Sequence, residues 1–282
     1  MTNHGVLRAL LVGAGLLLML VLGYFLSLYI VPSPQVAVVR IEGDIWGYYI
    51  AQVNDALEQA GNDPAVRAVV LDISSPGGEV TASEDLYYEV LKLREKKPVI
   101  ASVGELAASG AYYVASAADL IYAKPSSAVG NIGVISFLPE PDLIDEVLIT
   151  TGPFKLSGGS QVAYIRQMEV LKETFLAAIL AQRADRLKVG PEVLSRGEVY
   201  LGLQAEQMGM IDEIGSKGDA IAAAALKAGI RHYEIIDLSP ELPDEQDLFG
   251  FKFDTRLTAA SVAAPQAQMP PGFYFRYMEP LQ

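Results

Sequence analysis

The sequence contains no cysteine and only two histidines among its 282 residues. The lack of cysteine excludes disulfide bonds, thiolate metal sites and a cysteine nucleophile. The two histidines, His4 and His232, stand near opposite ends of the chain, which excludes a histidine-rich metal cluster. Catalysis would therefore depend on serine, threonine, lysine, tyrosine or carboxylate side chains, and no metal or other cofactor is expected.

Positive charge is also scarce. The chain has 21 lysines and arginines against 34 aspartates and glutamates, which gives a formal net charge of −13. A surface that follows a phosphate backbone needs clustered lysine and arginine. No such cluster is found, so nucleic acid is not an expected partner.

Residues 9–31 contain no charged side chain at all. At about 1.5 Å per helical residue, this segment is long enough to cross a hydrocarbon core of about 30 Å. The alternative is a cleaved signal peptide, whose apolar part runs for only about 7–15 residues and ends at a small-x-small site. The sequence LYIVP at residues 28–32 fits that site poorly. An uncleaved transmembrane anchor over residues 9–31 is therefore predicted, and it would make the lipid bilayer a partner.

The basic residues around this segment predict its orientation. His4 and Arg8 precede it, whereas no basic residue follows it before Arg40. Because basic flanks tend to stay in the cytoplasm, residues 1–8 are expected to be cytoplasmic. The chain is thus predicted to be a single-pass protein of the cell membrane with its main domain outside the cytoplasm.

The pattern of apolar residues after the anchor predicts an α/β fold. Strands are expected at residues 35–43, 67–73, 98–103, 120–123 and 233–238, and helices at 50–60, 81–96, 108–117 and 161–187. Strands that alternate with helices imply parallel pairing with helical crossovers. A single domain is therefore expected over residues 35–240, followed by a loosely ordered, proline-rich tail over 241–282.

The first segment with chemical information is DISSPGGEV, residues 72–80. It joins an expected strand end to an expected helix start. The adjacent Gly77 and Gly78 permit backbone conformations closed to other residues and let N–H groups approach a ligand. An ordinary tight turn would have the same composition, so this segment by itself does not decide between the two interpretations.

The second segment is VGELAASGAYY, residues 103–113, in which small residues surround Ser109. A serine at a helix start often only caps the helix. Here residues 107–111 leave almost no side-chain bulk around the hydroxyl, as attack on a peptide carbonyl would require. The N–H of Gly110 would point the same way, ready to stabilise an oxyanion.

Two further segments complete a pattern: AVGNIGV at residues 128–134 and RGEVYLGLQAEQMGMIDEIG at 196–215. In this order, over residues 36–215, the four segments resemble those of the signal peptide peptidase A family, which is related in fold to the caseinolytic protease and crotonase groups. The resemblance implies a crotonase-like fold of stacked β-β-α turns. It also implies a serine peptidase that works by a Ser/Lys dyad without a cofactor.

The resemblance also implies roles for single residues. Ser109 corresponds to the family's nucleophile, and Gly78 and Gly110 to the oxyanion donors. Gly77 and Asn131 fall on substrate-binding positions, the second of which is often serine in the family.

The family's lysine lies in a Gly-x-aromatic-Lys segment, which here is Gly152-Pro153-Phe154-Lys155. An alternative alignment would place Gln161 at the lysine position and imply an inactive enzyme, because an amide cannot act as a base. Both histidines are badly placed to replace a lysine. An unperturbed lysine, with a pKa of about 10.4, is neutral in only about four molecules per ten thousand at pH 7, so Lys155 is expected to be buried beside Phe154.

The expected function is cleavage of extended peptides near the membrane, such as remnant signal peptides, with unfolded proteins as further substrates. Two alternatives remain: an inactive membrane scaffold of the same fold, and an acyl-CoA hydratase or isomerase of the crotonase group. The resemblance also implies a homo-oligomer with sites shared between subunits. An apolar stripe along residues 161–187 would either cover such a subunit boundary or pack on the chain's own sheet.

Overall fold

The computed structural model describes residues 3–30, 32–136, 151–152, 154–155, 158–241 and 273–276. Its helices are α1 (Asn3–Ile30), α2 (Gly47–Asn62), α3 (Val80–Lys96), α4 (Gly110–Ser116), α5 (Gln161–Arg183), α6 (Pro191–Leu194), α7 (Gly202–Gln207) and α8 (Lys217–Lys227). Its strands are β1 (Gln35–Glu42), β2 (Val66–Ser75), β3 (Gly77–Glu79), β4 (Val99–Ala108), β5 (Leu120–Ala123), β6 (Ala128–Gly130), β7 (Ile135–Ser136), β8 (Val199–Leu201), β9 (Glu213–Ile214), β10 (Glu234–Asp237) and β11 (Phe273–Arg276).

The main sheet has eight strands with the central order β10-β1-β2-β4-β5-β9, and β6 and β8 extend it beside β4. All neighbours along the central path are parallel, and β6 pairs parallel with β4. Within this sheet, over the described residues, the one antiparallel pair is β6 with β8. The predicted β-α-β order of a mixed α/β fold is therefore confirmed.

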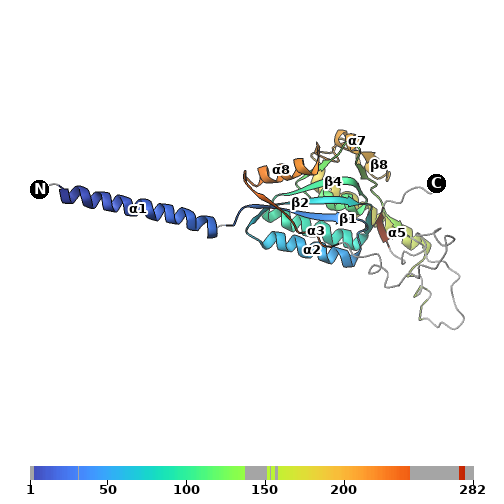
Figure 1. Cartoon of the computed structure of the whole chain (residues 1–282). Coiled ribbons are helices and arrows are strands. Elements are labelled where there is room, and N and C mark those ends of the chain that lie inside the picture. The colour runs from blue at the N-terminus through green and yellow to red at the C-terminus, as the bar shows by residue number, and fades with distance from the viewer. Residues whose placement is uncertain are drawn as a thin grey trace, which may run out of the picture.

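Helices cover both faces of this sheet, with α2 and α3 on one side and α8 on the other (Figure 1). Within β2, Val69 and Leu71 belong to the larger core cluster, and Val70 belongs to the smaller cluster that includes α8. Since neighbouring residues of a strand point to opposite faces, both faces of β2 are apolar. This explains the continuous apolar run of this strand, which is typical of a buried parallel sheet.

Helix α1 extends away from the rest of the molecule (Figure 1). Its described leucines are exposed, including Leu10, Leu16 and Leu20. The side chains at both ends of the expected anchor, residues 9 and 27–31, lie outside the described set. Over the residues that are described, none of the helices is both long enough and apolar enough to cross a membrane.

The strand predicted at residues 98–103 is longer in the structure, where β4 continues to Ala108. The helix predicted from residue 108 therefore begins only at Gly110. The reason is long-range pairing, because Leu106, Ala107 and Ala108 align with residues 128–130 of β6. Ser109 is thus the single residue between a strand and a helix.

One described part of the C-terminal tail, which was expected to be loosely ordered, is a strand. Residues Phe273–Arg276 form β11, which pairs antiparallel with β3 on one side and with β7 on the other. The result is a second, three-stranded sheet of order β3-β11-β7. In Figure 1, β11 is the short dark red strand near the label of α5.

Candidate active site

Ser109 has an unusual backbone conformation, with φ of 53° and ψ of −122°. A residue other than glycine rarely has positive φ, and such strain persists only where the surrounding structure enforces it. The residue stands at the sharp turn from β4 into α4. A strained strand-to-helix turn of this kind presents the nucleophilic serine in other hydrolases. Strain at this position supports the choice of Ser109 as the candidate nucleophile.

The third and fourth sequence segments hold this turn in place. The N–H of Ser109 donates to the carbonyl of Gly130 over 2.7 Å. The next residue, Asn131, donates its backbone N–H to the Glu198 carbonyl and its side-chain Nδ2 to the Gly197 carbonyl, both over 2.7 Å. The Asn131 side chain, expected at a substrate-binding position, thus bonds to the fourth segment in this structure.

The later part of the fourth segment forms a buried ion pair below α4. Arg183, which is only 1% exposed, contacts both carboxylate oxygens of Asp212 over 3.1 Å and the Gly209 carbonyl over 3.1 Å. Beside it, the Tyr112 hydroxyl donates to the Met210 carbonyl over 2.9 Å. Burial raises the pKa of Tyr112 to about 12, so the hydroxyl keeps its proton. These contacts fix α5 and the fourth segment to the nucleophile's helix.

Sequence reasoning missed Arg183. A signal was present, because Arg183 follows Phe175 and Ile179 at four-residue spacing and therefore continues their buried helix face. An arginine on a buried face needs a carboxylate partner, and Asp212 in the fourth segment is that partner.

The backbone at Gly78 leaves no space for a side chain. A Cβ atom there would lie 2.1 Å from the carbonyl oxygen of Ile45. That carbonyl accepts the Glu79 N–H, and the Ile45 N–H donates to the Gly77 carbonyl, each over 2.9 Å. Gly77 has a φ of 94°, which favours glycine. Strand β3 thus approaches residue 45 closely, and it also contacts α4, the helix that begins at Gly110.

The candidate base does not meet the candidate nucleophile within this chain. Ser109 Oγ is buried, and none of the described residues forms a hydrogen bond with it. Lys155 is exposed, and so are the neighbouring Phe154, at 51%, and the alternative Gln161. The expectation that Lys155 is buried beside Phe154 is therefore wrong for the single chain.

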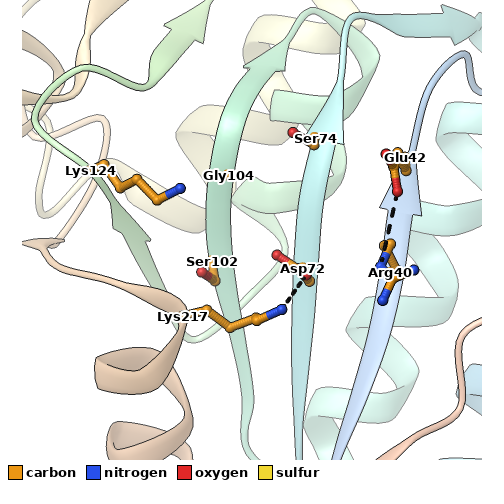
Figure 2. Close-up of a pocket in the computed structure, with 8 residues that line it drawn as sticks. All are labelled: Arg40, Glu42, Asp72, Ser74, Ser102, Gly104, Lys124 and Lys217. Carbon is orange, nitrogen blue, oxygen red and sulfur yellow. Dashed lines mark hydrogen bonds and ion pairs between the residues drawn. The ribbon is translucent and has the colours of Figure 1, made fainter.

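A separate polar cavity of about 280 Å³ lies on the α8 side of the sheet. Figure 2 shows its lining residues, which come from β1, β2, β4, the end of β5 and the start of α8: Arg40, Glu42, Asp72, Ser74, Ser102, Gly104, Lys124 and Lys217. Lys217 and Asp72 form an ion pair across it at 3.0 Å. None of the candidate site residues lines this cavity. Its β4 residues, Ser102 and Gly104, lie on the same strand face as Ile100, which packs against α8.

Comparison with known proteins identifies the family. Residues 92–231 match the model of peptidase family S49. A putative protease of Methanocaldococcus jannaschii is 33% identical over 221 residues, which cover 73% of this chain and 68% of that protein. The chain belongs to peptidase family S49. Protease 4 of Haemophilus influenzae is 34% identical, over 70% of this chain but only 35% of its own length, so the S49 chain spans about a third of that relative.

Solved structures of S49 proteases share the fold. The 1510-N membrane-bound stomatin-specific protease, solved as a variant with a substrate peptide, superposes with a TM-score of 0.52 at 17% identity and covers 77% of this chain and 95% of its own. The family makes this S49 chain a serine-type peptidase by descent. It does not favour an acyl-CoA hydratase or isomerase.

Proposed function

We propose that this S49 chain is a membrane-anchored serine endopeptidase that hydrolyses extended peptides with a Ser109/Lys155 dyad. The observation that carries the proposal is the strained backbone of Ser109 at the β4–α4 turn. A strain of this kind has a cost in stability, and a reactive serine is a reason for keeping it. The family and the small residues around Ser109 agree with this role.

The chemistry follows from the proposed positions. The neutral amine of Lys155 removes the proton from Ser109 Oγ as this oxygen attacks the peptide carbonyl. The N–H groups of Gly78 and Gly110 stabilise the oxyanion that forms. The protonated amine then gives its proton to the leaving amino group, and an ester on Ser109 remains. A water molecule, deprotonated by the same lysine, hydrolyses this ester and restores the serine.

We infer that the lysine comes from a neighbouring copy of the chain in a homo-oligomer. Two observations support a shared site: the buried Ser109 Oγ has no partner among the described residues, while Lys155 is exposed. The apolar stripe of α5 supports it as well. Its C-terminal half, with Phe175 and Ile179, is buried in the chain's own core, but Ile165 in its N-terminal half is 61% exposed.

The surroundings of the enzyme are proposed from the sequence. Residues 9–31 would anchor the chain in the bilayer, with residues 1–8 in the cytoplasm and the peptidase domain outside it. A site close to the membrane suits remnant signal peptides and other extended or unfolded substrates. The fold is proposed to be the crotonase-like superhelix of β-β-α turns, supported by the repeated return of the chain to one parallel sheet.

The test uses the full-length protein in detergent. Ser109→Ala and Lys155→Ala should each abolish hydrolysis of an unfolded protein, and the matched variant Gln161→Ala should keep most of it. A serine-directed phosphonate should label Ser109. Mixing the two inactive variants should restore part of the activity if the dyad is shared between subunits. Normal turnover in Lys155→Ala would show that another group is the base.

A further inference from the structure

The start of the main sheet lies next to the proposed membrane anchor. The chain passes from the end of α1 at Ile30 to the start of β1 at Gln35. These five steps along the chain span at most about 18 Å, so the start of β1 cannot be farther than that from α1. Because β1, β2, β4, β5 and β10 pair in parallel, their first residues share this edge of the sheet. In Figure 1, α1 leaves the domain at this edge.

Crossover helices end at the same edge, because a helix between two parallel strands runs back to where the next strand begins. Lys97, which follows α3, donates its amine to the carbonyls of Ala60 and Asp63 at the end of α2, over 2.6 and 2.5 Å. Lys227, the last residue of α8, forms an ion pair at 3.4 Å with Asp119, which directly precedes β5. We call residues 32–35, 62–67, 94–97, 119–120 and 226–235 the N-edge.

The N-edge is positively charged, although the whole chain is acidic. It contains six lysines and arginines against four aspartates and glutamates, whereas the chain has a formal net charge of −13. Four of the basic residues are exposed: Arg67, Lys96, Lys227 and Arg231. A basic residue in the last turn of a helix stabilises the helix end, which explains Lys96 and Lys227. Helix ends do not explain Arg67, which lies in β2, or Arg231, which lies beyond α8.

Apolar and aromatic side chains lie among these cations. Leu226 is 82% exposed and Ile235 is 57% exposed, and Tyr233 is half-buried. Ile235 pairs with Val36, so it lies beside the first strand after the proposed anchor. One exposed leucine is common on any protein surface. Exposed apolar groups together with a tyrosine and basic residues are typical of surfaces that bind in the headgroup region of a bilayer.

We propose that the N-edge lies on the membrane surface and binds anionic lipids. The side chains of Leu226 and Ile235 enter the headgroup layer. Around them, Arg67, Lys96 and Arg231 bind the lipid phosphates. This inference rests on the proposed anchor, which keeps the N-edge within reach of the bilayer. The anchor sets the distance of the domain from the bilayer, and the contacts of the N-edge set its orientation.

This orientation fixes the distance of the candidate nucleophile from the bilayer. Strand β4 runs for ten residues from the N-edge to Ala108, and Ser109 follows it. At about 3.3 Å per residue, Ser109 lies about 30 Å above the N-edge. A substrate that is still held in the membrane would need roughly nine extended residues outside the bilayer to reach it. The N-edge thus selects peptides that protrude far from the membrane or have left it.

Because the chain contains no cysteine, a fluorescent dye can be attached to one chosen position without background. The full-length protein is reconstituted in vesicles of phosphatidylcholine and phosphatidylglycerol that contain a lipid with a spin label near its headgroup. With the dye on Leu226→Cys, quenching by the spin label should be several-fold stronger than with the dye on Leu203→Cys. Leu203 is a matched control, because it is a 49% exposed leucine of α7, which lies toward the other end of the domain (Figure 1).

A charge reversal tests the role of the cations. Arg231→Glu, added to Leu226→Cys, should lower the quenching of the dye several-fold in the same vesicles. The control Arg196→Glu changes another exposed arginine, outside the N-edge, and should leave the quenching unchanged. In vesicles of phosphatidylcholine alone, the two variants should be quenched equally. Equal quenching in the vesicles with phosphatidylglycerol would overturn the binding of anionic lipids.

A third position separates this inference from the proposed anchor. The dye on Leu18→Cys, in α1, should be quenched by a lipid that carries its spin label deep in the acyl chains. If it is quenched, and the dye on Leu226→Cys is quenched no more than the dye on Leu203→Cys, the N-edge inference is refuted and the anchor stands. If the dye on Leu18→Cys is not quenched, the anchor is refuted, and the inference that rests on it is refuted as well.

Discussion

The backbone N–H of Ser109 donates to the carbonyl of Gly130 over 2.7 Å, and this bond ties the candidate nucleophile to β6. Gly130 has a φ of 113°, so its carbonyl direction depends on a conformation that favours glycine. The same bond occupies the N–H of Ser109 itself. This leaves the N–H groups of Gly78 and Gly110, rather than that of Ser109, for the proposed oxyanion site.

The strain at Ser109 predicts a change that stabilises the protein and removes its activity. Ser109→Gly should relieve the positive φ and increase the free energy of unfolding by about 1 kcal/mol, while hydrolysis disappears. Thermal unfolding should show a rise of about 2–4 °C. The control Ser116→Gly, in the buried part of α4, should have the opposite sign. A lower melting temperature for Ser109→Gly would show that the turn is not strained.

The contact at Gly78 predicts that even the smallest side chain is harmful. A Cβ atom 2.1 Å from the Ile45 carbonyl forces β3 to shift, so Gly78→Ala should reduce kcat/KM by at least about a hundredfold. Gly133→Ala is the control, since nothing lies within 4 Å of its Cβ position. Peptide hydrolysis and circular dichroism of the two variants should be compared. Equal activity would separate Gly78 from the site.

The buried ion pair predicts a large effect on stability. Asp212→Ala leaves the buried Arg183 without its partner and should cost about 3–5 kcal/mol in the free energy of unfolding. Asp72→Ala removes a more exposed pair with Lys217 and should cost less than about 1 kcal/mol. Urea unfolding of both variants measures the difference. Similar midpoints would mean that the Arg183 pair does not anchor α5.

The exposed half of α5 predicts the assembly of the chain. Ile165→Asp should leave the fold intact but prevent association, because it places a charge in the expected subunit contact. Thr174→Asp, at an exposed position further along the same helix, is the control. Light scattering measures the mass, and the peptidase rate should fall with it if sites are shared. An unchanged mass for Ile165→Asp would exclude this face as the interface.

The choice of a lysine base predicts the dependence of the rate on pH. Lysine must lose a proton before it accepts one from Ser109, so the rate should rise as pH increases above neutrality. A histidine base would instead follow a titration near pH 6.5. Initial rates between pH 6 and pH 10 on a neutral peptide distinguish the two. A profile that is flat from pH 6 would contradict the lysine assignment.

The sequence by itself determined the parallel α/β plan and the candidate nucleophile. Strand β5 at Leu120–Ala123 has the predicted bounds, and the other predicted strands and helices are present in the predicted order, because buried strands and amphipathic helices are recorded in local apolar patterns. The short strands β3, β6, β7, β8, β9 and β11 were not predicted. The small residues around Ser109 are likewise a local signal. They led to the choice of Ser109 as the candidate nucleophile, although the positive φ of Ser109 could not be predicted from them.

Tertiary structure decided what depends on partners distant in sequence. Strand β11 forms because residues 77–79 and 135–136 present two edges, and its own residues cannot specify either of them. The extension of β4 to Ala108 depends in the same way on β6. The partnership of Arg183 with Asp212 joins two segments 29 positions apart. The position of Lys155 relative to Ser109 also depends on contacts between segments distant in sequence. A local sequence pattern does not show which surface a distant side chain will contact, or whether that surface belongs to the same copy of the chain.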